Sequence, residues 1–155
     1  MTAHVHLSLG SNLGDRADHL RRALDAVAAL PETRLVAQSS VHETAPWGVT
    51  GQPSFLNLAA EIETALGPLE LLNAVKTVEI CLGRTPGPLW GPRAIDIDLV
   101  LWEDRVMETD ALTLPHARFR ERAFVLLPLR EIAPDAVDPV TGCTVAELAA
   151  ALDGC

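Results

Sequence analysis

Two aspartates in one short apolar segment are the residues best suited to chemistry. Residues 93–101 have the sequence RAIDIDLVL, with carboxylates at Asp96 and Asp98. If the segment is a strand, its side chains alternate between faces, and the two aspartates share one face with Cα atoms about 6.5 Å apart. Carboxylates this close repel each other unless a cation or an arginine lies between them. Magnesium commonly takes one or two carboxylates together with substrate phosphates, so the pattern indicates a magnesium site.

An alternative is that the aspartates are the solvated face of an edge strand, because short motifs often match by accident. Val100 and Trp102 continue the aspartate face with apolar side chains, which argues against open solvent. The sequence has neither a glycine-rich phosphate loop ending in Gly-Lys-Ser/Thr nor a G-x-G-x-x-G fingerprint. A bound nucleotide would therefore be held by metal and arginine. Lys76 is the one lysine of the chain, which argues against lysine chemistry.

Phe55 and Asn57 form a second candidate group. They alternate with apolar residues and would share one face of another strand. An aromatic ring beside an amide can stack on a flat heterocycle and hydrogen-bond its polar edge. The alternative is a phenylalanine in a minor core and an asparagine bonded to a loop backbone, and the residues alone leave both interpretations open.

A third group is basic and aromatic, and comprises His116, Arg118, Arg120, Arg122 and Phe124. The histidine could hydrogen-bond a phosphate or ribose oxygen, although a lone histidine is more often structural. On a chain of net charge −9, local arginine groups suit a small polyanion such as a nucleotide better than DNA or RNA. Scattered solubilising charge is the alternative for any single arginine.

These residues need a scaffold, and the hydrophobic periodicity supplies one. Strand patterns are expected at residues 4–9, 35–44, 54–64 and 95–102, and helical patterns at 16–30, 68–82, 119–132 (broken near Pro128) and from Thr144. The order βαββαβ predicts a single α+β domain over residues 1–155, a ferredoxin-like antiparallel sheet covered by helices. Helical periodicity places Glu79 on the solvated side of its helix.

The chain length of 155 residues fits one domain with a real core. No apolar run approaches the roughly 20 residues that span a bilayer. The N-terminus enters a strand pattern at once, so no signal peptide is expected. A soluble, cytoplasmic protein is therefore expected, with no membrane partner.

Seven segments in order carry a resemblance to a known family: LGSNLG at 9–14, QPSFLN at 52–57, LGR at 82–84, WGPRAIDID at 90–98, LPH at 114–116, RAFVL at 122–126 and PLREIAPD at 128–135. Together they extend over nearly the whole chain, and the sequence resembles the 6-hydroxymethyl-7,8-dihydropterin pyrophosphokinase family of folate biosynthesis. The W-G-P-R-x-I-D-I-D segment is highly specific, whereas G-S-N-L-G alone would be weak.

The resemblance implies a monomeric α+β enzyme that transfers pyrophosphate from ATP to the pterin alcohol and releases AMP. It implies that Asp96 and Asp98 bind two magnesium ions bridging the ATP phosphates, and that Arg84 and Arg93 join them in catalysis. The partners would be small molecules, with no nucleic acid.

The resemblance also implies where the substrates bind. Asn57 and the backbone near Thr44 would bind the pterin, with Phe55 and Phe124 stacking on its two faces. The nucleotide and lid region would comprise Glu79, Arg84, Trp90, Arg93, Leu99, Thr113, His116 and Arg122, with Leu99 and Thr113 near the adenine and ribose.

One departure from the family lies in Thr85–Leu89, which is uncharged where relatives commonly carry further basic residues. A stiffer lid with less positive charge is expected. Two other functions stay open: a magnesium-dependent nucleotidyl or phosphoryl transferase with a different acceptor, and a non-enzymatic ligand-binding domain of ferredoxin-like type.

Overall fold

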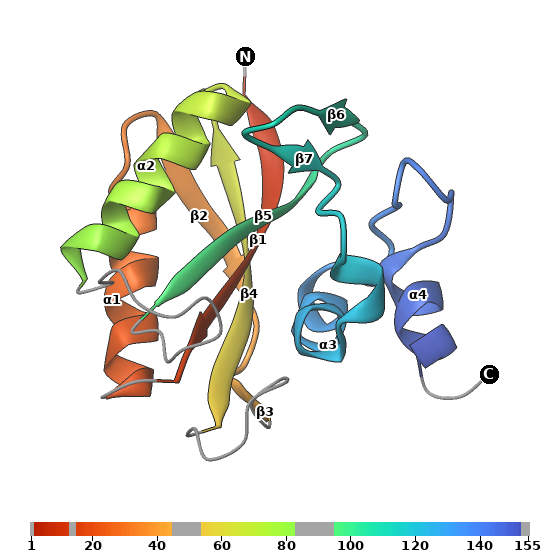
Figure 1. The fold of residues 1–155 in the computed structure, drawn as a ribbon, viewed down its shortest axis with the longest axis horizontal. Coiled ribbons are helices and arrows are strands. Elements are labelled where there is room, and N and C mark those ends of the chain that lie inside the picture. The colour runs from red at the N-terminus through yellow and green to blue at the C-terminus, as the bar shows by residue number, and fades with distance from the viewer. Residues whose placement is uncertain (1, 13–14, 45–53, 83–94, 153–155) are drawn as a thin grey trace.

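A five-stranded antiparallel sheet lies between two helical layers (Figure 1). The computed structural model describes residues 2–12, 15–44, 54–82 and 95–152. The sheet consists of β1 (Ala3–Ser11), β2 (Thr33–Gln38), β3 (His42–Thr44), β4 (Phe55–Thr64) and β5 (Asp96–Trp102). The strand order is β2-β4-β1-β5, β3 also pairs with β4, and every pair is antiparallel.

The first face of the sheet is covered by α1 (Arg16–Ala28) and α2 (Pro68–Cys81). The α1 helix begins where the Asp15 side chain accepts a hydrogen bond from the backbone N–H of Asp18. The main core lies between these helices and the sheet, and consists of aliphatic side chains such as Leu7, Leu20, Leu71 and Ile97.

The second face is partly covered by α3 (Ala123–Ile132), preceded by the short helix η1 (Phe119–Glu121) and followed by α4 (Val145–Leu152). A second, smaller core joins these helices to Ala59 of β4 and Leu101 of β5. A two-stranded hairpin of β6 (Met107–Glu108) and β7 (Thr113–Leu114) follows β5. None of the helices in the described ranges is long and apolar enough to cross a membrane.

The expected α+β class, an antiparallel sheet covered by helices, is confirmed, and β1-α1-β2-β4-α2-β5 has the βαββαβ order. Several boundaries differ from expectation, and the strand expected at residues 4–9 continues to Ser11. The strand expected at 35–44 is interrupted after Gln38, and the helix expected from Phe119 begins at Ala123. That helix continues through Pro128. The helical layer on the second face was not expected.

Arg120 belongs to this C-terminal layer and pairs with the fully buried carboxylate of Asp138 through Nε and through Nη2 at 2.9 Å. It therefore does not contribute to a basic nucleotide site, contrary to the grouping by sequence. Burial of Asp138 opposes its ionisation, but hydrogen bonds from Arg120, the Thr141 hydroxyl and the Val140 N–H outweigh burial. Together they lower the pKa of the carboxyl to about 2.

We expect Asp138→Asn to lower the free energy of unfolding by about 3 kcal/mol at neutral pH, because it leaves Arg120 without its charged partner. Because the pKa of Asp138 is lowered by folding, its ionised carboxylate stabilises the fold fully at pH values above the ordinary pKa of 3.8. This contribution is lost as the pH falls towards about 2. The difference between wild type and variant, measured by urea unfolding, should shrink over that range. Asp135→Asn, at an exposed aspartate, is the control. An equal loss in both variants would contradict the assignment.

Candidate active site

A row of residues crosses four strands on the second face of the sheet. His42 of β3 pairs with Asn57 of β4, Asn57 with Gly10 of β1, and Gly10 with Asp96 of β5. Directly opposed residues of paired strands lie on the same face. Ile97, next to Asp96, lies in the main core on the first face, so the row faces the opposite way.

A second row runs beside the first and consists of Ala59, Ser8 and Asp98. Asp96 and Asp98 are both half-buried and lie two residues apart on the same face of β5. Two adjacent carboxylates therefore lie on the same sheet face as Asn57, separated from it by β1.

Gly10 determines how closely Asn57 approaches β1. A Cβ atom on Gly10 would lie 2.6 Å from Asn57 Oδ1 and 3.7 Å from Phe55 Cδ1. A contact of 2.6 Å is a severe overlap, so the Asn57 amide occupies the space that a side chain at position 10 would need. The missing side chain places Phe55 and Asn57 together over β1.

The carboxylate of Glu79 binds the backbone between the two aspartates. Its Oε2 accepts a hydrogen bond of 2.7 Å from the Ile97 N–H, and its Oε1 lies 3.3 Å from Lys76 Nζ. Glu79 is only 1% exposed, so the expectation of a solvated charge from helical periodicity is wrong. It is buried because α2 packs against β5.

His116 lies where the charges of the site meet. Its backbone N–H donates to the Val100 carbonyl at 2.9 Å, which fixes it beside β5. Burial lowers the pKa of His116; Asp98 acts in the opposite direction, and Arg122, Arg118 and Lys76 lower it further. The imidazole is therefore close enough to all four charges to be affected by them.

The hydrogen bonding of His116 also selects its tautomer. The Arg118 N–H donates to His116 Nδ1 at 3.2 Å, so this nitrogen carries no proton in the neutral ring. The proton is then on Nε2. A neutral His116 thus keeps an N–H donor for an anionic oxygen, in addition to the nearby positive charges.

Arg122 and Phe124 lie at the start of α3, where Arg122 is the N-cap residue. The Arg122 guanidinium carbon is 5.4 Å from the centroid of the Phe124 ring, within range of a cation–π contact. Phe124 is half-buried against the second core, which joins α3 to β4. The aromatic ring therefore belongs to the helix that covers the second face.

Two other residues named from the sequence lie outside these two rows. Leu99 is 3% exposed in the main core, because it alternates with Asp98 along β5. Thr113 is half-buried in β7, next to β5. Arg84, Trp90 and Arg93 lie outside the described residues, as does the side chain of Thr44, whose backbone pairs with Phe55 in β4.

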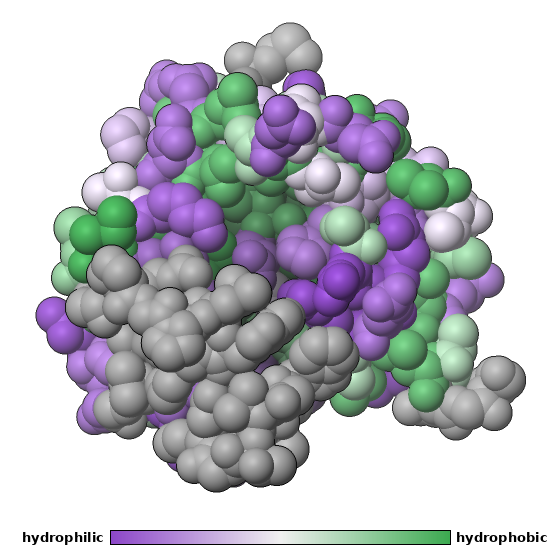
Figure 2. Space-filling model, in the orientation of Figure 1, coloured by the Kyte–Doolittle hydropathy of each residue, from purple (hydrophilic) through white to green (hydrophobic). Residues whose placement is uncertain are grey.

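The molecular surface has a hollow over β5, between α2 and the β6–β7 hairpin (Figure 2). Hydrophobic surface forms its depth and hydrophilic residues form its rim. Within the described ranges, no group of three or more His, Cys, Asp or Glu side chains could hold a metal ion. The two aspartates are hard oxygen ligands of the kind that magnesium takes together with water and substrate phosphates.

Sequence reasoning missed two contributors to this site. Gly10 lies just outside the strand expected at residues 4–9, although a glycine inside a strand signals a close approach of another group. Lys76 was set aside as the only lysine, yet it contacts Glu79 and acts on His116. No local pattern around Lys76 could have indicated this, because the contact depends on how α2 packs on β5.

Residues 6–134 match the family described as 7,8-dihydro-6-hydroxymethylpterin-pyrophosphokinase (HPPK). The chain is 49% identical over 149 residues to a 2-amino-4-hydroxy-6-hydroxymethyldihydropteridine pyrophosphokinase of Methylorubrum extorquens, covering 96% of this chain and 93% of the relative. The protein of the same name from Pseudomonas aeruginosa is 42% identical over 135 residues, 87% of this chain and 83% of the relative.

Solved structures show the same fold at low sequence identity. The HPPK-DHPS protein of Plasmodium falciparum with pteroate matches with a TM-score of 0.78 at 15% identity, and another HPPK-DHPS in complex with substrates matches with 0.76 at 13%. Each match covers 97% of this chain but only 42% and 43% of the solved chains. This chain therefore spans less than half the length of those proteins.

We expect Glu79→Ala to lower the free energy of unfolding by about 2 kcal/mol, because the buried Ile97 N–H loses its acceptor. Glu79→Gln retains an acceptor oxygen and should lose clearly less. Urea unfolding gives the two free energies, and hydrogen exchange at the Ile97 amide should accelerate in the alanine variant only. Equal stability of the alanine variant and the wild type would show that the bond does not support β5.

Proposed function

The chain belongs to the 7,8-dihydro-6-hydroxymethylpterin-pyrophosphokinase family, and from this premise we propose that it transfers pyrophosphate from ATP to 6-hydroxymethyl-7,8-dihydropterin. AMP is the second product, and the reaction is a step of folate biosynthesis. The proposal rests on one observation above all. Asp96 and Asp98 lie across Gly10 and Ser8 from the strand that carries Asn57, on one sheet face.

The reaction joins two substrates that each need a different surface. The hydroxymethyl oxygen attacks the β-phosphorus of ATP, and the bond from that phosphorus to the oxygen bridging the α-phosphate breaks. The hydroxyl proton is lost to solvent and AMP leaves. Positioning and charge stabilisation supply most of the catalysis in phosphoryl transfer, so this mechanism does not require a strong general base.

Asp96 and Asp98 are the proposed ligands of two magnesium ions. Their fit rests on the donor set: paired, half-buried carboxylates and no third acidic or imidazole ligand among the described residues. Such a site suits ions whose remaining ligands are phosphate oxygens and water. When bound, magnesium neutralises the phosphate oxygens and spreads the charge that develops in the transition state. The contact between Glu79 and Ile97 holds the backbone between the two ligands.

Positive groups around His116 would bind the phosphate oxygens left free by the metal. Arg122 and Lys76 both act on His116, and its Nε2–H is a donor in the neutral ring. We further propose that Arg84 and Arg93 contribute to catalysis and that Trp90 lies in the nucleotide region, on the strength of the family resemblance. The hollow over β5 suits the nucleoside. The family resemblance is the ground for proposing Leu99 and Thr113 near the base and ribose, and Leu99 would contribute through its backbone because its side chain lies in the main core.

The pterin is assigned to the Asn57 end of the row. An amide can donate to and accept from the polar edge of a pterin, and the backbone near Thr44 lies in the neighbouring strand. Phe55, beside Asn57 over Gly10, and Phe124, at the start of α3, are the proposed stacking partners. The family resemblance also supports a monomer that acts on these two small molecules, and we propose that it is cytoplasmic.

We expect Asp98→Asn to reduce AMP release at least about a hundredfold, because loss of a metal-binding charge removes transition-state stabilisation. The melting temperature should hardly change, since the side chain lies on the half-buried face and not in the core. A coupled assay for AMP with ATP, magnesium and the pterin measures the rate. Asp104→Asn, an exposed aspartate after β5, is the matched control and should remain active.

The products decide between this function and its alternatives. Release of ADP or pyrophosphate by the wild type would indicate a different transferase on the same scaffold. No turnover by the wild type, with ligand binding unchanged in Asp98→Asn, would indicate a non-enzymatic binding domain.

We expect Phe124→Ala to weaken pterin binding by about 1 kcal/mol, close to fivefold in Kd, because one stacking face is lost. Phe124→Leu keeps an apolar side chain against the second core but offers no aromatic face, so it should show a similar loss. Isothermal titration with the pterin gives the affinities, and ATP affinity serves as the internal reference. Full pterin affinity in the leucine variant would refute the stacking role.

A further inference from the structure

A bulge separates β2 from β3 opposite β4. Gln38 pairs with Ala60 and His42 pairs with Asn57, so three residues (39–41) face only two (58–59). An extra residue in one strand leaves part of that strand outside the hydrogen-bond ladder and shifts the register of the residues after it. The register of β3 against Asn57 therefore depends on the contacts that stabilise this bulge.

Two serines stabilise the bulge from different sides. The Ser39 N–H donates to the Ala59 carbonyl, and the Ser39 hydroxyl accepts from the Ala59 N–H, both at 2.9 Å. Ser39 thus extends the pairing of β2 with β4 by one residue, through one backbone and one side-chain hydrogen bond. The Ser40 N–H instead donates to Glu131 Oε2 at 2.9 Å, and the Ser40 hydroxyl donates to Glu131 Oε1 at 2.6 Å.

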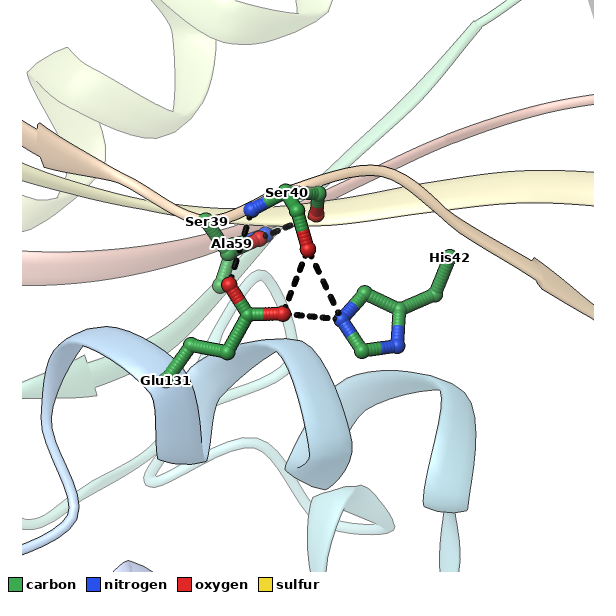
Figure 3. A network of polar contacts seen from close by, with 5 residues as sticks. All are labelled: Ser39, Ser40, His42, Ala59 and Glu131. Atoms are coloured by element: carbon green, nitrogen blue, oxygen red, sulfur yellow. Dashed lines mark hydrogen bonds and ion pairs between the residues drawn. The ribbon is translucent and has the colours of Figure 1, made fainter.

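Glu131 also contacts β3 itself, because its Oε1 lies 2.5 Å from His42 Nε2 (Figure 3). Its carboxylate therefore contacts both the bulge and the first residue of β3. Hydrogen bonds from the Ser40 hydroxyl, the Ser40 N–H and His42 lower the pKa of Glu131 to about 2, so the carboxylate is ionised at neutral pH.

The group is not a nucleophilic triad. Ser40 Oγ, at 3.5 Å, and Glu131 both face the same nitrogen, Nε2, of His42. In a catalytic triad the nucleophile and the carboxylate contact opposite nitrogens of the imidazole. The arrangement can position backbone, but it cannot relay a proton from serine to carboxylate through the ring.

Glu131 connects the two elements that carry the proposed pterin contacts. It lies in the last turn of α3, and Phe124 lies in the first turn of the same helix. His42 and Thr44 of β3 pair with Asn57 and Phe55 of β4. A change in the register of β3, or in its distance from α3, would therefore alter the proposed pterin site on the side of Asn57 and Phe55. The other side of that site is set by α3, which carries Phe124.

We propose that Glu131 is a positioning residue for the pterin, which fixes β3 beside Asn57 and sets its distance from α3. This inference rests on the proposed function and extends it to a residue outside the proposed substrate contacts. Loss of Glu131 should therefore affect pterin binding selectively, since Asp96 and Asp98 lie on β5 at the other end of the row.

The test compares the KM for the pterin with the KM for ATP in variants of the full chain. We expect Glu131→Ala to raise the KM for the pterin about tenfold, the equivalent of one hydrogen bond to a charged group, and to leave the KM for ATP within about twofold. Glu131→Gln keeps one acceptor oxygen and should show an intermediate increase. Arg130→Ala, at the exposed preceding residue of α3, is the matched control and should behave as the wild type.

Hydrogen exchange provides a readout independent of activity. In Glu131→Ala, the amides of residues 40–44 should exchange faster, whereas those of β5 should not. If Glu131→Ala does not fold, Ser40→Ala and Glu131→Gln carry the same test with smaller expected effects. Equal increases in both Michaelis constants of Glu131→Ala, or an unchanged pterin KM in an active Glu131→Ala, would overturn the inference alone. A wild type that forms no AMP would overturn the proposed function and this inference with it.

Discussion

The lack of a side chain at Gly10 is the constraint on which the candidate site depends. Asn57 Oδ1 lies where a Cβ atom of residue 10 would be, so the amide is held close to β1. On the other side of Gly10 lies Asp96. A single residue without a side chain therefore separates the proposed pterin contact, Asn57, from the first of the proposed metal ligands, Asp96, on one sheet face.

Buried charge controls the geometry on the β5 side of that glycine. Glu79 is ionisable and almost fully buried, and an unpaired charge there would be costly. Its contacts with the Ile97 N–H and Lys76 compensate for burial. The strand that carries the two aspartates thus has a further carboxylate behind it, and Lys76 lies next to that carboxylate as its positive partner.

The sequence predicted the site-bearing strands better than the packing around them. Alternation along β5 is a local property, so the common face of Asp96 and Asp98 and the core position of Ile97 follow from period two. Glu79 could not be assigned in the same way, because its burial depends on the docking of α2. Arg120 was grouped with its neighbours in sequence, while its partner Asp138 lies 18 residues away. The bulge before β3 carries no glycine or proline, so the pattern at 35–44 gave no sign of an interruption.

The proline inside α3 has a consequence for the ring at the start of that helix. Pro128 has no backbone N–H, so it cannot donate to the carbonyl of Phe124, four residues earlier. The opening turn of the helix therefore lacks one of its internal restraints, whereas the closing turn is tied to the bulge by Glu131. A helix that is restrained at its closing turn and lacks one hydrogen bond near its opening turn bends more easily there than an uninterrupted helix would.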